Sequence, residues 1–193
     1  MKKTFFLIPG FMQSDKDKQI TWLIKFLKKG GFRVMVVPIH WKNRVMSEYI
    51  EEFKKFYDVH KTDSNYILGF SYGAVIAFIT ANQLKPKKIY LCSLSPEFKE
   101  DAIKMKPWVR KLIGKRRFQD AKKRSGKAIA KELKVPSVIL YGEAEGRKFP
   151  QLKILCEETA KLATKSKLVI VRNATHNLDH PEYIKSLKKE LCI

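Results

Sequence analysis

The sequence predicts an α/β protein in which helices cover both faces of a mostly parallel sheet. Short runs rich in β-branched and aromatic residues alternate with longer helical patterns, as is typical of a parallel sheet between two helical layers. The 193 residues are 45% hydrophobic, enough for one substantial core, and no segment has the composition of a flexible linker. We therefore expect a three-layer sandwich with about six strands, in a single domain over residues 1–193.

The expected strands are short apolar runs bounded by turn-forming or polar residues. The first run stops at Pro9-Gly10, and the third runs directly into Gly69. By this criterion the strands are Thr4–Ile8, Arg33–Val37, Tyr66–Leu68, Lys88–Cys92, Ser137–Tyr141 and Leu168–Val171.

Capping and breaking residues mark the helices between these strands. Ser14-Asp15-Lys16-Asp17 resembles a capping box that opens a helix, and Gly30-Gly31 ends it. The helix after the third strand ends before Pro86, and the last helix opens at Asp179-His180-Pro181-Glu182. Periodic apolar residues predict the buried stripes: Met46, Tyr49, Ile50, Phe53, Phe56 and Tyr57 in the second helix, and Ile184, Leu187 and Leu191 in the last.

Residues 95–135, between the fourth and fifth strands, are longer than a simple crossover connection. Residues 99–134 within them hold 14 basic and only 4 acidic residues. Pro107-Trp108-Val109 with Leu112 and Ile113 predicts a short amphipathic helix, whose apolar stripe faces either the sheet edge or a bound substrate. We interpret the segment as an inserted basic helical cap.

The chain carries a net charge of +21, from 40 Lys and Arg residues against 19 Asp and Glu. Such a charge favours anionic partners at low salt. However, 32 of the basic residues are Lys, which accumulates on solvated surfaces, whereas phosphate recognition more often uses Arg. General surface enrichment and selection for an anionic partner therefore both stay open. Half of the eight arginines lie in the cap: Arg110, Arg116, Arg117 and Arg124.

Gly69-Phe70-Ser71-Tyr72-Gly73 joins an apolar strand to a helix rich in small residues, which is the setting of a nucleophile elbow. A sharp strand-to-helix turn strains the central residue, and the flanking glycines let the chain segments approach without Cβ clashes. Ser71 would then stand exposed at a helix N-terminus, where negative charge on a substrate is favoured. The alternative is a tight turn with an inert serine.

A serine hydroxyl needs a base to take its proton and an acid to orient that base. His176 follows the last strand, a position that would bring it to the carboxyl edge of the sheet beside Ser71. An ordinary loop histidine is the competing interpretation. The remaining histidines fit less well. His40 precedes Trp41, which we expect in a pocket wall, and His60 and His180 lie in polar helix ends.

Two carboxylates follow the fifth strand and are candidates for the acid. We expect Glu145 to take this role, with Glu143 as the alternative, although either residue could be a solvated loop acid. The resulting order, Ser71, then Glu145, then His176, differs from the orders of the two familiar serine-protease families.

In these features the chain resembles a compact member of the α/β-hydrolase superfamily over nearly its whole length. The resemblance rests on the elbow, the acidic loop beyond the cap, and His176 before the last helix. Residues 8–12 resemble the superfamily's His-Gly oxyanion loop, with proline in place of histidine, and glutamate stands where aspartate is common. The resemblance implies a sheet trimmed of the usual first strands, and an oxyanion hole built from the backbone N–H groups of Phe11, or Met12, and Tyr72.

The resemblance also implies a serine hydrolase that cleaves a carboxylic ester or thioester through an acyl-enzyme. Bulky apolar residues near strand ends suit an acyl or aromatic group, and we expect Trp41, Phe98 and Trp108 in the substrate pocket. With the basic cap they suggest a small-molecule substrate that has an anionic portion. The alternative function is a non-catalytic protein of the same fold that binds anionic partners through its cap. The bulky apolar residues near strand ends also include Phe11, Met12, Tyr72 and Phe149.

Other functional classes lack support in the sequence. It contains no Gly-rich phosphate loop and no metal-like spacing of His, Cys and carboxylates, so we expect no cofactor and no metal. We expect no specific nucleic-acid partner and no membrane span. The apolar start of the chain stops at Pro9-Gly10, too early for a secretion signal. Three cysteines, Cys92, Cys156 and Cys192, fit reduced thiols in a cytoplasmic protein.

Overall fold

A computed structural model describes residues 3–191 of the chain. Its six strands form one sheet in the order β2-β1-β3-β4-β5-β6, and every neighbouring pair is parallel. The predicted six-stranded α/β sandwich is therefore confirmed, with a sheet that is wholly rather than mostly parallel. The strands are β1 (Lys3–Ile8), β2 (Arg33–Val36), β3 (Ser64–Phe70), β4 (Lys88–Cys92), β5 (Ser137–Gly142) and β6 (Ser166–Val171).

Three strands begin earlier than their apolar runs predict, β1 by one residue and β3 and β6 by two. β3 starts at Ser64, which pairs with Lys3, and β6 starts at Ser166, which pairs with Ser137. A parallel ladder is made by backbone groups, so polar residues at the end of a strand extend it without any hydrophobic signal. β2 is one residue shorter than predicted and ends at Val36.

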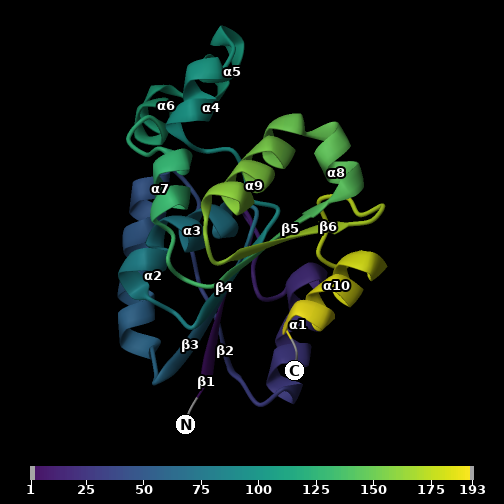
Figure 1. Ribbon diagram of the computed structural model, residues 1–193. Helices are drawn as coiled ribbons and strands as arrows, with labels where there is room; N and C mark the ends of the chain where they lie inside the picture. Colours follow the sequence, from purple (N-terminus) through teal and green to yellow (C-terminus); the bar gives the residue numbers. More distant parts are fainter. Residues whose placement is uncertain (1–2, 192–193) are drawn as a thin grey trace.

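Helices cover both faces of the sheet, as Figure 1 shows. One face packs against α2 (Met46–His60), α3 (Tyr72–Leu84), α7 (Gly126–Glu132) and α9 (Pro150–Leu162). The other face packs against α1 (Lys18–Lys29) and α10 (Pro181–Leu191). Because both faces are covered, the strands are buried on both sides and the two cores lie back to back across the sheet.

The buried helix stripes follow the predicted spacing, except that Phe56 in α2 and Ile184 in α10 are only half-buried. In α10, Tyr183 is fully buried together with the predicted Leu187. The helix α1 begins at Lys18, after the Ser14–Asp17 segment, whose Ser14 amide donates to the Asp17 carboxylate at 2.6 Å. The capping residues therefore form a turn before the helix instead of its first turn.

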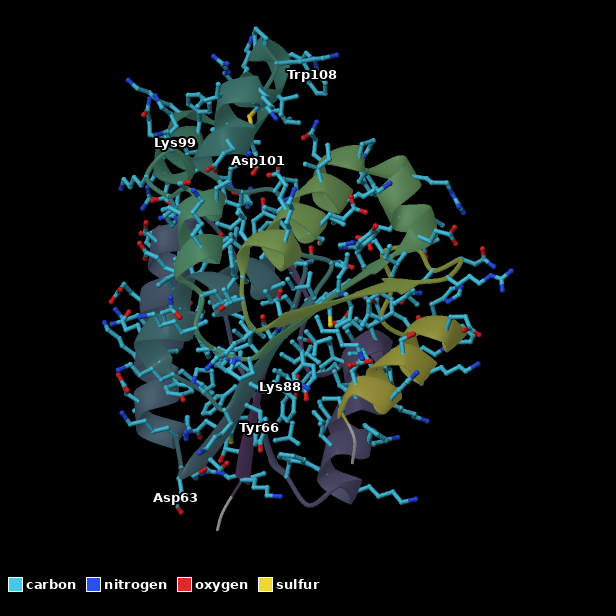
Figure 2. All side chains as sticks on the ribbon, in the orientation of Figure 1. Asp63, Tyr66, Lys88, Lys99, Asp101 and Trp108 are labelled. Atoms are coloured by element: carbon cyan, nitrogen blue, oxygen red, sulfur yellow. The ribbon has the colours of Figure 1, made fainter. Side chains whose placement is uncertain are left out.

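Residues 95–135, here called the cap, contain α4 (Lys99–Lys104), α5 (Pro107–Ile113), α6 (Lys115–Ala121) and the sheet-packed α7. The helices α4 to α6 project from the body of the molecule, at the top of Figure 1. Trp108 lies near their outer end (Figure 2) and is 65% exposed. Trp108 and Leu112 of the α5 stripe are therefore exposed and pack on neither the sheet nor the site described below, whereas Ile113 at the end of α5 lines a cavity near that site.

The two described cysteines, Cys92 and Cys156, are buried and free, and burial raises the pKa of both thiols. Cys192 lies outside the described residues. Within residues 3–191, none of the helices has the length and apolarity that crossing a bilayer requires.

Candidate active site

Ser71 occupies a strained turn between β3 and α3. Its backbone has φ 55° and ψ −116°, a conformation that residues with a Cβ adopt at a cost of about 1–3 kcal/mol. A Cβ on Gly69 would lie 2.1 Å from the carbonyl oxygen of Gly73, and one on Gly73 would lie 2.0 Å from that of Ile8. The two glycines thus allow the close approach that holds Ser71 at the carboxyl end of β3.

The close contact at Gly73 brings the loop after β1 against the start of α3. The rings of Phe11, in this loop, and Tyr72, the first residue of α3, lie with centroids 5.5 Å apart. Among the described residues, neither the Phe11 nor the Tyr72 amide donates a hydrogen bond, and the Met12 amide does not either. Two free N–H groups therefore lie on residues that are in contact beside Ser71.

His176, which follows β6, is oriented by Glu145, which follows the neighbouring strand β5. The Nδ1 atom of His176 hydrogen-bonds the Oε1 atom of Glu145, and the imidazole packs on Phe70 with ring centroids 4.7 Å apart. Glu145 is 1% exposed. An ionised carboxylate can only accept hydrogen bonds, so Nδ1 carries the proton and Nε2 is left as an acceptor.

The second oxygen of Glu145 is also held. Its Oε2 atom accepts from Ser93 Oγ at 2.8 Å and from the Gly142 amide at 3.1 Å. The Ser93 hydroxyl in turn lies 3.2 Å from the Tyr183 hydroxyl. These contacts compensate the burial of the carboxylate and fix its direction.

Backbone packing places the two partners on adjacent segments. The helix α8 (Glu143–Lys148) begins directly after β5, so Glu145 lies in a first helical turn and not in a loop as predicted. A Cβ on Gly142 would lie 2.3 Å from the carbonyl oxygen of Ala174, and the Glu145 amide donates to that same oxygen at 3.1 Å. The segment that carries His176 is thereby held against α8.

Glu143, the alternative acid, points elsewhere. Its carboxylate accepts from the Asn173 amide and from Arg147, both at 3.0 Å, on an exposed surface. The hydrogen bond from Asn173 lowers the pKa of Glu143, with the charges of Arg147 and Arg172 adding to the effect. The structure therefore brings Glu145, and not Glu143, to His176.

Ser71 and His176 line one cavity of about 660 Å³ at the carboxyl edge of the sheet. Phe149, Pro150 and Leu152 from the start of α9 form an apolar part of its wall. The Ser71 hydroxyl hydrogen-bonds Ser95 Oγ at 3.1 Å, and between the described Ser71 and His176 side chains there is no hydrogen bond. The hydrogen-bond partner of the Ser71 hydroxyl is therefore Ser95 and not the imidazole.

None of the three residues expected in the substrate pocket lines the cavity at Ser71. Phe98 is fully buried in the core against Phe78, and Trp108 is exposed on the cap, so neither lines the cavity at Ser71. Trp41, in the segment after β2, lines a second cavity together with Phe11. These positions depend on the packing of the cap and of the loop after β2, which hydrophobicity alone does not specify.

Sequence reasoning missed the serines after β4. Ser93 and Ser95 lie in the segment that follows this strand, and they contact Glu145 and Ser71 respectively. Ser93 has φ 54°, so it too occupies a strained position at the carboxyl edge. The available signal was position: two serines directly after the strand next to the elbow strand.

The described part of the chain contains no cluster of three or more His, Cys, Asp or Glu side chains that could hold a metal ion. The polar groups at the site instead form a serine, an imidazole with one free nitrogen, and a buried carboxylate. This set is suited to acid–base chemistry on a bound carbonyl compound.

No family model and no curated protein sequence matches the chain. Solved structures do. Est1E from Butyrivibrio proteoclasticus, which has also been solved with ferulic acid bound, aligns with a TM-score of 0.80 at 15% identity, over 99% of this chain and 88% of that one. Alpha/beta hydrolase domain-containing protein 10 from mouse aligns with a TM-score of 0.80 at 10% identity, over 98% and 88%.

A lipase-esterase related protein from Clostridium acetobutylicum aligns with a TM-score of 0.69 at 15% identity, over 98% of this chain and 93% of that one. At these identities the likeness shows the fold: the chain has the α/β-hydrolase fold, as its motifs predict.

Proposed function

We propose that the protein is a serine hydrolase that cleaves small carboxylic esters or thioesters through an acyl-enzyme. The observation that carries the proposal is the buried Glu145 carboxylate on the Nδ1 atom of His176, because it leaves Nε2 available beside a strained serine. The hydrolase and esterase names of structurally similar proteins support the reaction class.

In the first half-reaction, Ser71 turns from Ser95 to His176 and attacks the substrate carbonyl carbon. The Nε2 atom of His176 takes the hydroxyl proton as the new C–O bond forms. The tetrahedral intermediate then collapses: its bond to the leaving alcohol or thiol breaks, and His176 returns the proton to that group. Glu145 stays ionised and stabilises the transient imidazolium.

In the second half-reaction, water takes the place of the leaving group. His176 removes a proton from the water, whose oxygen attacks the acyl carbon, and the intermediate collapses to release the carboxylic acid and regenerate Ser71. Both steps require the same base, so the loss of His176 slows acylation and deacylation together.

The oxyanion of each tetrahedral intermediate is assigned to the amides of Phe11 and Tyr72. Both N–H groups are unbonded among the described residues, and the Tyr72 amide also lies at the N-terminus of α3. Oriented donors of this kind act where charge develops and typically contribute about 10²–10³-fold each. Met12 is the less suitable donor, since its residue is 67% exposed.

The apolar wall at the start of α9 is assigned to one half of the substrate. Phe149, Pro150 and Leu152 offer a surface for an acyl chain or aryl ring within reach of Ser71. The ferulic acid bound by Est1E supports a small organic substrate for this chain as well.

The experiment is hydrolysis of a panel of 4-nitrophenyl esters and matched thioesters of increasing acyl length by wild type, Ser71→Ala and His176→Ala. We expect turnover in wild type and a loss of at least about 10³-fold in both variants. Ser186→Ala, on α10 across the sheet, is the matched control and should keep wild-type rates. Full activity of Ser71→Ala, or no hydrolysis of any ester or thioester by the folded protein, would contradict the proposal.

A further inference from the structure

A second cavity, of about 620 Å³, lies on the other side of Ser71 along the sheet edge. Its walls include Phe11, after β1, and residues 41–45, after β2, whereas the first cavity is built from segments after β4, β5 and β6. Ser71 follows β3, which stands between β1 and β4 in the sheet. The strand order therefore puts the serine between the two cavities.

The second cavity is strongly basic. Its lining includes five basic side chains and no acidic one. These basic residues come from the loop after β2 and from the start of the cap helix α6. The cavity at Ser71 by contrast is lined by one lysine, one glutamate and one histidine besides uncharged residues. The five basic residues are Lys42, Arg44, Lys115, Arg116 and Arg117.

Two of these cations are neutralised by acids on α2. Arg44 contacts Glu52 at 3.2 Å, and Arg116 contacts Glu48 at 2.6 Å. Among the described residues, the other three, Lys42, Lys115 and Arg117, make no ion pair within 4.0 Å. The cavity lining therefore carries an excess of positive charge, and the acid whose charge interacts with Arg117, the buried Glu97, lies outside this lining.

Arg117 is the cation best placed to contact a ligand near Ser71. Its guanidinium lies 5.0 Å from the ring centre of Tyr72 and 5.2 Å from that of Phe11, the two residues assigned to the oxyanion hole. Its Nη2 atom is buried and donates no hydrogen bond among the described residues. Arginine stays protonated in proteins, so Arg117 keeps its positive charge and this N–H donor at every pH at which the protein is folded.

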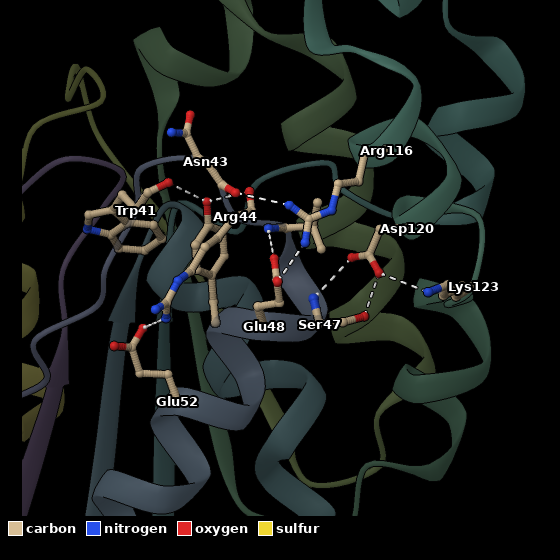
Figure 3. A network of polar contacts seen from close by, with 11 residues as sticks. Trp41, Asn43, Arg44, Ser47, Glu48, Glu52, Arg116, Asp120 and Lys123 are labelled. Carbon is tan, nitrogen blue, oxygen red and sulfur yellow. Dashed lines mark hydrogen bonds and ion pairs between the residues drawn. The ribbon is translucent and has the colours of Figure 1, made fainter.

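The walls of the cavity are held by polar contacts, several of which Figure 3 shows. The Tyr49 hydroxyl donates to the carbonyl oxygens of Trp41 and Arg44, at 2.8 and 2.9 Å. From the cap, Arg116 donates to the carbonyl oxygen of Asn43 at 3.0 Å, and Asp120 accepts from the Ser47 amide at 3.0 Å. The cations are thus carried on segments that are fixed to one another.

We propose that this cavity binds a carboxylate or phosphate group of the substrate, with Arg117 as the principal contact. The substrate is then an ester or thioester whose apolar half lies against α9 and whose other half is anionic, with the scissile carbonyl at Ser71 between them. That the bound anion is part of a substrate rests on the proposed function. The binding of an anion in this cavity does not. A guanidinium supported by two aromatic rings presents its paired N–H groups in the geometry that carboxylate and phosphate oxygens accept.

The first test compares esters that differ only in charge. Two pairs are used, one with a free carboxylate or its methyl ester on the acyl half, the other with the same change on the leaving group. In at least one pair, wild type should have the higher kcat/KM for the anionic ester, and Arg117→Met should lower this preference about tenfold, mainly through KM, as expected for one charged hydrogen bond. Arg117→Lys should retain part of the preference.

Lys111→Met is the matched control, since Lys111 is exposed on α5 outside the cavity and its loss changes the net charge equally. It should leave the preference unchanged. An equal loss in Lys111→Met, or no preference for the anionic ester in either pair, would overturn the inference, because a general field of the basic protein would then explain everything.

The second test does not depend on catalysis. Binding of inorganic phosphate at low salt is measured by calorimetry on Ser71→Ala, with and without Arg117→Met, while circular dichroism verifies folding. The inference predicts weaker binding, by about tenfold, when Arg117 is replaced. Unchanged phosphate binding would overturn the anion site even if ester hydrolysis is found, whereas Arg117-dependent binding without hydrolysis would refute the proposed function alone.

Discussion

The two sides of Ser71 differ in how their polar groups are balanced. Toward β4, β5 and β6, the side chains of His176, Glu145 and Ser93 form one chain of hydrogen bonds inside a buried network. Toward β1 and β2, three of the described cations line a cavity and make no ion pair within 4.0 Å, and Arg117 among them interacts with the buried Glu97, which lies outside the cavity lining. A polar group whose hydrogen-bond partners all come from the protein is fixed in position. A charged group without an ion-pair partner is available to bind a ligand of opposite charge.

The two sides also differ in what holds them in place. Glu145 and His176 lie on segments locked to the sheet by backbone contacts at Gly142 and Ala174. Arg117 lies on the cap, which is fixed to α2 by side chains such as Asp120 (Figure 3). We therefore expect changes on the first side to affect the rate of chemistry, and changes on the second to affect selectivity and local stability.

The largest effect should come from the buried acid. Replacing Glu145 by Gln keeps the shape of the side chain but removes the charge that stabilises the imidazolium and selects the Nδ1–H tautomer. We expect kcat for ester hydrolysis to fall about 10³–10⁴-fold. Glu143→Gln is the matched control two residues away, on the exposed surface, and should stay within about twofold of wild type.

An equal loss in the two variants would remove the distinction between the two carboxylates. A small loss in Glu145→Gln alone would show that His176 is oriented by other contacts, among which the stacking on Phe70 is the first candidate.

The next effect concerns the attachment of the cap. Asp120 is 3% exposed and accepts hydrogen bonds from Ser47 and Arg124. Asp120→Asn leaves Arg124 largely buried without its counterion, so we expect a loss of about 3 kcal/mol in the free energy of unfolding, measured by urea denaturation. The preference for anionic esters should weaken as well, because the wall that carries Arg117 is loosened.

The Asp120 carboxylate should also make the attachment of the cap sensitive to low pH. Burial by itself would raise the pKa of Asp120, but hydrogen bonds from Arg124 and Ser47 outweigh it and hold the pKa below the usual 3.8. Its contribution to stability is therefore complete above pH 3.8 and is lost as the pH falls through the lowered value. If Asp120→Asn proved as acid-sensitive as wild type, this contribution would be negligible.

A third effect distinguishes the cap side by its response near neutral pH. Burial raises the pKa of Glu97 to about 7, although the charge of Arg117 opposes the rise, and Glu97 accepts a hydrogen bond from the Tyr72 hydroxyl. Because the folded state holds this proton more tightly than the unfolded one, stability falls as the pH rises from about 4.5 to about 7.

Glu97→Gln removes this titration. We expect wild type to lose roughly 2 kcal/mol relative to the variant across that pH range, after allowance for solvent screening of the half-buried group, as measured by urea denaturation at each pH. Parallel pH profiles for the two proteins would contradict the assignment.

The smallest effect compares two aromatic residues. Phe149 lines the cavity at Ser71, and Trp108 lines neither of the two cavities. Phe149→Ala should raise KM for aryl or long-chain esters about tenfold, in line with the loss of one apolar contact surface. Trp108→Ala should leave kcat/KM unchanged and the free energy of unfolding within about 0.5 kcal/mol. A larger effect on kcat/KM at Trp108 would place substrate against α5, outside both cavities.

The sheet and the elbow could be predicted because their signals are local. An apolar run followed by Gly69 to Gly73 specifies both a strand and a turn, and parallel strands bring their carboxyl ends to one edge. Glu145 and His176 follow from that same rule. The sequence also favours Glu145 over Glu143, but the physical reason appears only in the structure, in the first turn of α8, where Glu145 folds back toward Gly142.

The cap could not be predicted in the same way. Its short helices have no sheet register to orient them, so the pattern around Trp108 predicts an amphipathic helix without saying what it faces. Among the cap arginines, only contacts with α2, about 70 residues earlier, distinguish Arg116, which is paired with Glu48, from Arg117, which is not. Such long-range pairing leaves no mark on the local sequence.

The most direct test of the account is labelling by a fluorophosphonate probe, followed by intact-mass analysis of wild type, Ser71→Ala and His176→Ala. The account predicts a single adduct on wild type, none on Ser71→Ala, and much slower labelling of His176→Ala, because only a serine activated by the imidazole attacks the probe. An unlabelled folded wild type, or an adduct that persists in Ser71→Ala, would contradict it.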